Sequence, residues 1–238
     1  MLEGDKLEDH KKQFFDLIEE MEVIKGYQLN QEIKLWKVTQ DIFSGNFKNL
    51  CYVIDRFEQD NGVIFFKDNL KFDETCLEIL RLFHNYSSSS FTLIEHTIRF
   101  RGNLNNENIN AFYETELKKL RDIDVVVFMK DLRHLVQHHS LPISTAHINF
   151  EKENKLCFKV QKLLIWDGWT RKPREYLSKL NGDLEIKLFC KEYYENTVKF
   201  NDAFSKHVYK EYEKDFIELN NFKEYIKKLY PLYSNNIA

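Results

Sequence analysis

Four residues near the middle of the chain have side chains that suit chemistry on a phosphodiester. Arg133, His134, His138 and His139 lie within seven positions, shortly before Pro142. Histidine exchanges protons close to neutral pH, so it can serve as a general acid or base. Arginine carries a lasting positive charge and a planar fork of donors that fits a phosphate group. The segment therefore contains the residue types needed to bind or cleave a phosphodiester.

Two less specific interpretations apply to the same histidines. Protonated histidines in the last turn of a helix are stabilised by the helix dipole, by about 0.3–1 kcal/mol at an exposed site. His134 and His138 are also four residues apart, which suits two ligands of one metal ion on a helix. However, no glutamate follows His134 at the spacing of a zinc protease, and the four cysteines form no CxxC pair. We therefore expect no metal and no cofactor.

A long amphipathic helix is predicted to carry this segment. From about Ile109 to His139, apolar residues recur every three or four positions, which is the spacing of one buried helix face. Pro142 follows its end, because proline cannot donate to the helical ladder and restricts the residue before it. Residues five apart lie about 140° apart around an ideal helix, so Arg133 and His138 share no face. They can meet only if the last turn is distorted or if two copies of the chain combine.

Similar periodicity predicts helices along most of the chain. They cover residues 6–25 and 29–43, ended by Gly26 and Gly45, and then 73–85, 91–100, 174–180, 184–219 and 222–229. Between 144 and 165, apolar and polar residues alternate on both sides of a polar turn at 152–154, which predicts a β-hairpin. We expect a mainly α protein: a helical bundle with a β-hairpin insertion and a long C-terminal helix.

Composition agrees with this fold class. The 238 residues include only seven Gly and three Pro, whereas 43% are hydrophobic, which disfavours an all-β sandwich. The chain has no internal repeat and no low-complexity linker. We therefore expect residues 1–238 to form a single helical domain, with its C-terminal helices at 173–230.

Charge and hydropathy restrict the partners and the compartment. The net charge of -3 provides no global basic field for nucleic acid, so any contact with RNA must be local. No run reaches the ~18 apolar residues of a membrane-spanning helix. The first ten residues are acidic and polar, unlike a secretory signal. We expect a cytoplasmic protein that does not bind a membrane.

A second candidate surface follows the predicted hairpin. Aromatic and basic side chains alternate there, and together they could stack on and pair with single-stranded RNA. Aromatic residues at the end of a hairpin are more often part of the core, so this interpretation ranks below the histidine segment. The residues concerned are Trp166, Trp169, Arg171, Lys172 and Arg174.

The sequence Arg-His-Leu-Val-Gln-His at 133–138 resembles the signature of the HEPN family, an arginine followed by a polar residue, three further residues and a histidine. The Ser-Leu-Pro at 140–142 is similar to the way this segment ends in several bacterial HEPN-like proteins. HEPN bundles also often carry an acidic residue shortly before a basic one on an earlier helix. Glu95 and Arg99 have that form, although they also make an ordinary i,i+4 surface pair. The resemblance covers mainly residues 74–142.

This resemblance implies metal-independent cleavage of RNA, in which the ribose 2′-hydroxyl attacks the adjacent phosphate. His138 would be the acid and base, Arg133 would bind the scissile phosphate, and His134 would orient either group. His139 is an alternative to His138, and the sequence does not choose between them. Glu95 and Arg99 would support these residues.

The resemblance also implies partners. HEPN proteins that cleave RNA usually build one cleft from two copies of the motif, which implies a homodimer here. A role as a toxin or in phage defence, with an antitoxin or another partner protein, is implied as well. One alternative is a non-catalytic HEPN-like module that binds RNA or protein. Another is an unrelated helical scaffold.

Overall fold

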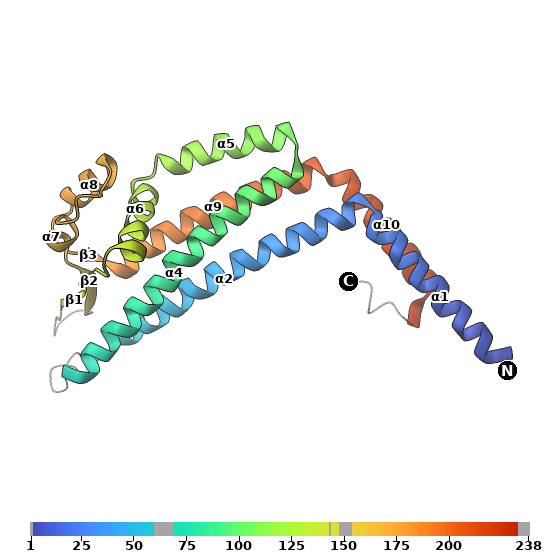
Figure 1. Ribbon diagram of the computed structural model, residues 1–238, viewed down its shortest axis with the longest axis horizontal. Coiled ribbons are helices and arrows are strands. Elements are labelled where there is room, and N and C mark those ends of the chain that lie inside the picture. The colour runs from blue at the N-terminus through green and yellow to red at the C-terminus, as the bar shows by residue number, and fades with distance from the viewer. Residues whose placement is uncertain (1, 60–68, 143, 148–153, 233–238) are drawn as a thin grey trace. The chain divides into compact units, whose positions relative to one another are not determined.

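The computed structural model describes residues 2–59, 69–142, 144–147 and 154–232. These residues form nine helices and three short strands (Figure 1), which confirms the predicted mainly α fold with a β-hairpin. Among them, every helix is too short or too polar to span a bilayer. The helices are α1 (Leu2–Val23), α2 (Lys25–Gln59), α4 (Asn69–Leu104), α5 (Glu107–Arg121), α6 (Asp124–His138), α7 (Val160–Leu163), α8 (Arg171–Ser178), α9 (Ile186–Glu211) and α10 (Glu213–Leu229), and the strands are β1 (Ser144–His147), β2 (Lys155–Phe158) and β3 (Leu184–Glu185).

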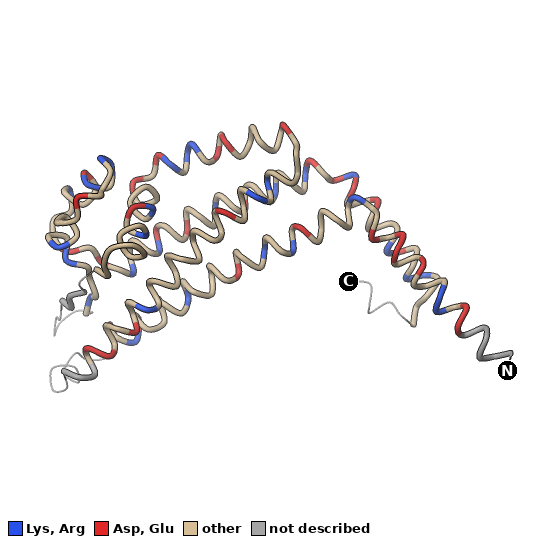
Figure 2. The backbone as a smooth tube through the Cα atoms, viewed as in Figure 1, with Lys and Arg blue, Asp and Glu red and all other residues tan. Residues whose placement is uncertain are grey.

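The chain divides into two compact units, Met1–Lys37 with Ser205–Ala238, and Val38–Phe204. Helices α2 and α9 contribute residues to both units. The single domain expected from the sequence stays a prediction, because compactness alone does not show which parts fold independently. Basic and acidic residues are interspersed along the helices of both units, as Figure 2 shows, in keeping with the small net charge.

The first unit is built around the packing of α1 against α10. Gly26 lies in the first turn of α2, where a Cβ atom would clash with the carbonyl oxygen of Asp215 on α10. The prediction that Gly26 ends a helix is therefore wrong: the chain breaks at Ile24, and glycine is needed for this close approach. One cluster of buried apolar residues in this unit consists of Phe14, Met21, Leu219, Ile226 and Tyr230.

In the second unit, aromatic rings hold α2, α4 and α9 together. The ring centroid of Phe43 on α2 lies 5.2 Å from that of Tyr86 on α4 and 6.2 Å from that of Tyr193 on α9. The Tyr86 hydroxyl donates a hydrogen bond of 2.9 Å to the carbonyl oxygen of Cys190 on α9. Burial raises the pKa of Tyr86 well above its ordinary value, so this hydroxyl keeps its proton and remains a donor.

The predicted helices at 73–85 and 91–100 are one continuous helix, α4. A run of serines lies between the two predicted ranges. The hydroxyls of Ser87, Ser89 and Ser90 each donate to a carbonyl oxygen three residues earlier. Serine side chains that bond back to the preceding turn can stay inside a helix. Helix α2 also continues, through Gly45, although the sequence predicts that Gly45 ends it.

Two predicted helices are instead divided. The helix expected over 109–139 separates into α5 and α6, because Asp122 ends the first and Ile123 has an extended backbone with ψ of 119°. The helix expected over 184–219 divides at Tyr212 into α9 and α10. The apolar spacing continues across both breaks, so it does not reveal them.

The predicted β-hairpin is present, but its second strand ends earlier than expected. Strands β1 and β2 are antiparallel, with Ser144 opposite Phe158 and His147 opposite Lys155. Residues 160–163 form the helical turn α7 rather than the end of a strand, and β3 pairs with β2 from the other side. Part of the predicted turn at 152–154 lies outside the described residues.

The turn before α8 is attached to α6 by one carboxylate. Asp131 is 7% exposed, and it accepts hydrogen bonds from the backbone nitrogen of Thr170 at 2.8 Å and from its Oγ1 at 2.7 Å. Thr170 directly precedes α8, so these bonds satisfy a donor at the start of that helix. Asp131 thereby determines where the segment around Trp166 meets α6.

We expect Asp131→Ala to lower the free energy of unfolding by about 2 kcal/mol, because two hydrogen bonds to a charged acceptor are lost. Thr170→Val removes only the hydroxyl donor, and it should cost about 1 kcal/mol. Urea denaturation measures both changes. Asp167→Ala, at an exposed carboxylate, is the matched control, and an equal loss in that variant would contradict the assigned role of Asp131.

Candidate functional site

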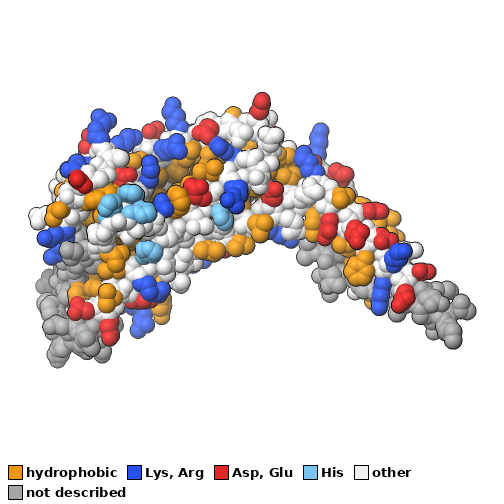
Figure 3. Space-filling model, in the orientation of Figure 1, with side chains coloured by type: hydrophobic (Ala, Val, Ile, Leu, Met, Phe, Trp, Pro, Cys, Tyr) orange, Lys and Arg blue, Asp and Glu red, His pale blue; other side chains and the backbone are white. Residues whose placement is uncertain are grey.

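Three imidazole rings meet at the end of α6. The ring centroid of His134 lies 4.9 Å from that of His138 and 5.3 Å from that of His139. His134 and His138 are about one helical turn apart and so share a face. His139 reaches the same place because it leaves helical geometry, with φ of -129° and ψ of -66°. All three residues are exposed, and Figure 3 shows histidine side chains gathered on this face over α6.

Trp166, from the turn between α7 and α8, joins this group. Its ring centroid lies 5.9 Å from that of His134 and 5.4 Å from that of His139. Arg174 on α8 donates from Nη2 to the Trp166 carbonyl oxygen at 3.3 Å, which keeps its guanidinium beside the turn. Two residues of the aromatic and basic cluster predicted after the hairpin, Trp166 and Arg174, thus lie beside the predicted histidines. We call His134, His138, His139, Trp166 and Arg174 the histidine–tryptophan patch.

The other members of the predicted aromatic and basic cluster lie elsewhere. Trp169 is a core residue: it is 6% exposed, and its Nε1 donates to the Leu163 carbonyl oxygen at 2.7 Å. Arg171 is exposed and lies 3.7 Å from a carboxylate oxygen of Glu175, a surface pair that contributes little to stability. Lys172 lines a cavity on another side of α6.

Arg133 also faces that cavity rather than the histidines. Its guanidinium carbon lies 3.4 Å from the centroid of the Phe91 ring on α4. Its Nε is buried and has no hydrogen-bond partner among the described residues. Among the described residues of one chain, no hydrogen bond or ring contact joins Arg133 to His138. The two motif residues therefore occupy different environments, in agreement with their angular separation on the helix.

The predicted supporting residues lie on α4, and both are exposed. Burial lowers the pKa of Arg133, and the negative charge of Glu95 opposes this change. Glu95 is therefore coupled to the arginine of the motif. Arg99 lies one helical turn further along α4.

The cavity has a volume of about 450 Å³ and is enclosed by α4, α5, α6 and α9. Figure 3 shows a hollow with hydrophobic walls near the histidines, with Lys and Arg side chains at its edge. The break between α5 and α6 forms this cavity, because α5 then lies beside α4 instead of extending α6 (Figure 1). The sequence does not reveal this cavity, because the apolar spacing predicts one uninterrupted helix over 109–139.

Side chains that could bind a metal ion and the cysteine thiols are two further kinds of candidate site. In the described ranges, no group of three or more His, Cys, Asp or Glu side chains could hold a metal ion. The four cysteines are free, and burial raises the pKa of Cys51, Cys76 and Cys157 to about 11. Those three thiols therefore remain protonated near neutral pH and are poor nucleophiles.

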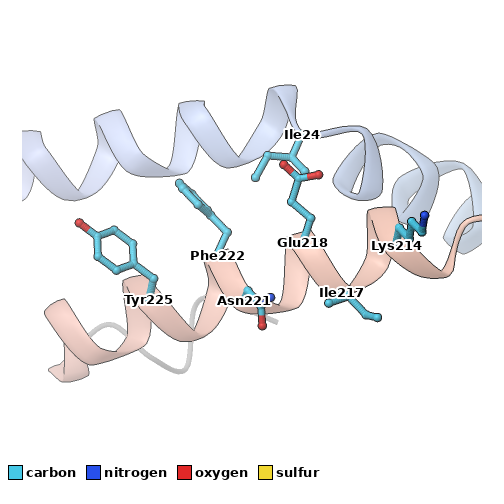
Figure 4. Close-up of a pocket in the computed structure, with 7 residues that line it drawn as sticks. All are labelled: Ile24, Lys214, Ile217, Glu218, Asn221, Phe222 and Tyr225. Atoms are coloured by element: carbon cyan, nitrogen blue, oxygen red, sulfur yellow. The ribbon is translucent and has the colours of Figure 1, made fainter.

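A second concave surface, in the first unit, is a shallow groove along α10. Its lining is mainly apolar. Figure 4 shows Phe222 and Glu218 pointing toward the N-terminal helices, whereas Ile217 and Asn221 point away from them. Ile217 and Tyr225 are each about half exposed, so an apolar strip remains on this unit.

The chain matches no protein-family model, and no curated protein or solved structure shows significant similarity to it. The resemblance to the HEPN family therefore rests on the motif residues alone. The activity that the resemblance implies stays a proposal.

Proposed function

We propose that this protein is a metal-independent endoribonuclease of the HEPN type, in which His134 and His138 exchange protons with RNA. The observation that carries the proposal is the pair of exposed imidazoles with ring centroids 4.9 Å apart. Attack by the ribose 2′-hydroxyl requires a base to take its proton and an acid to protonate the departing 5′-oxygen. One neutral and one protonated histidine can supply both groups near neutral pH.

The remaining residues of the histidine–tryptophan patch have roles that suit the same reaction. The Trp166 ring offers a surface on which an RNA base can stack. Arg174 supplies a fixed positive charge near the charge that develops on the phosphorane. His139 is the alternative to His138, since its ring also lies beside that of His134.

The proposal includes a homodimer. In one chain Arg133 faces the cavity and does not accompany His138, so we infer that a second copy supplies the phosphate-binding arginine to the histidines. The size of the active species in solution, measured by light scattering, tests this part. A fully active monomer would contradict the homodimer and leave Arg174 as the cation of the site.

Toxin or phage-defence activity, with an antitoxin or other partner, belongs to the same proposal.

A second candidate function is binding of RNA without cleavage. The separation of Arg133 from His138 favours it, because the usual phosphate-binding group is then missing beside the imidazoles. The same patch would still offer stacking and positive charge to a single strand.

We expect His134→Ala and His138→Ala each to slow the cleavage of single-stranded RNA about 100-fold or more in the presence of EDTA, since each removes a general acid or base. A fluorescent RNA oligonucleotide reports the rate, and its 2′-deoxy counterpart should resist cleavage. His139→Ala, measured in parallel, decides between His138 and its neighbour.

His96→Ala is the matched control, because His96 is an exposed histidine of α4 outside the patch. It should cleave RNA at the wild-type rate, and all four variants should unfold near the wild-type temperature. Undiminished cleavage by both His134→Ala and His138→Ala would refute the catalytic proposal. Absence of cleavage by the wild type, together with RNA binding that depends on the patch, would support the second candidate.

Binding can be tested apart from cleavage with an RNA that carries 2′-O-methyl groups. Trp166→Ala should weaken binding about tenfold, because stacking of one base on an aromatic ring contributes about 1–3 kcal/mol. Arg174→Met should reduce the dependence of log K on log salt concentration by about 0.7, as expected for one phosphate contact on a single strand. Fluorescence anisotropy measures both.

The control for this experiment is Tyr52→Ala, which removes an exposed aromatic residue of α2. Its affinity for the RNA should equal that of the wild type. An equal loss in Tyr52→Ala and Trp166→Ala would show that the patch is not the RNA surface.

A further inference from the structure

The cavity between α4, α5, α6 and α9 has an apolar wall large enough to surround a small molecule. Side chains such as Ile94, Leu117, Val127 and Met129 form much of this wall. The volume of about 450 Å³ lies within the range of small-molecule sites, roughly 300–1,000 Å³.

The same cavity carries a local excess of positive charge. Arg121, Lys130, Arg133 and Lys172 all line it, and no Asp or Glu is among its lining residues in the part of the chain that the structure describes. Lys172 lies 3.7 Å from a carboxylate oxygen of Asp122, but both side chains are exposed, so this pair is weak. Although the chain as a whole has a net charge of -3, an anion is favoured here.

Arg133 offers this anion a specific contact. Its guanidinium is stacked on the Phe91 ring, and its Nε is buried without a partner among the described residues. A buried donor without an acceptor is destabilising, and a carboxylate that bonds the guanidinium in bidentate fashion would satisfy it. The charge of Glu95 acts on Arg133 from α4, but Glu95 does not line the cavity.

The polar groups contributed by α9 already bond within the protein. Tyr193 forms side-chain hydrogen bonds with Ser90 and Thr197, and Asn201 Nδ2 donates to the Thr197 carbonyl oxygen at 2.8 Å. The side chains of Tyr193 and Asn201 therefore do not need a second polar or charged group on the ligand as a hydrogen-bond partner. An occupant with one anionic end and an aliphatic body can pair with Arg133 and pack against the apolar side chains of the lining.

We propose that this cavity binds a medium-chain fatty acid, with its carboxylate on Arg133 and its aliphatic chain against the wall that includes Leu117 and Val127. This site shares no residue with the histidine–tryptophan patch of the same chain, and its binding of a fatty acid does not depend on ribonuclease activity. The aliphatic side chains of the wall favour an alkyl chain, and the buried Arg133 Nε, which has no partner among the described residues, favours a carboxylate beside it.

Isothermal titration of the full chain with decanoate tests the proposal. We expect saturable binding of one decanoate per chain. Decan-1-ol, which lacks the charge, and propionate, which lacks most of the alkyl chain, should each bind at least tenfold more weakly. Arg133→Met should weaken decanoate binding at least tenfold, whereas Arg133→Lys, which keeps the charge, should weaken it less.

Arg99→Met is the matched control, because Arg99 is an exposed arginine of α4 that does not line the cavity. It should bind decanoate like the wild type. Leu117→Trp narrows the cavity without changing its charge, and it should weaken decanoate binding at least tenfold. If Arg133→Met proves unfolded in a thermal melt, Arg133→Lys and Leu117→Trp decide the outcome. Absence of saturable binding, or equal binding by the wild type and Leu117→Trp, would overturn the proposal.

Discussion

The packing of Phe128 determines where the candidate functional residues lie. Its buried ring has centroid distances of 5.4 Å to Trp169, 5.0 Å to Tyr176 and 5.8 Å to Phe189. These contacts bury one face of α6 against α8 and α9, and this sets the rotation of α6 about its axis. Once that rotation is set, the histidines at its end must face solvent, and Arg133 must face the cavity.

This rotation separates the two parts of the motif. His134 and His138 join Trp166 on the surface, whereas Arg133 stacks on Phe91 at the cavity. An arginine and a histidine five positions apart can act on the same phosphate only if another chain supplies one of them or if the helix end rearranges. The structure of one chain thus places two separate groups of basic side chains around α6, an exposed one at the histidine–tryptophan patch and another that lines the cavity.

Local charge matters more than net charge in both environments. Basic and acidic residues are interspersed over the molecule, so attraction of an anion depends on the few cations beside each site. At the patch this cation is Arg174, held by the Trp166 carbonyl oxygen. At the cavity, four basic side chains line a largely apolar space, where their charges are less screened than in open solvent.

The sequence by itself determined the helical class, the hairpin and the grouping of His134 with His138, because each follows from local spacing along the chain. Only the tertiary structure decided that α5 and α6 separate at Asp122. The apolar spacing continues through the break, because it indicates which face of a helix is buried and not where the helix bends. The tertiary structure also brought Trp166 to the histidines and enclosed Arg133 in a cavity, because contacts between distant segments depend on how helices pack and not on any local pattern.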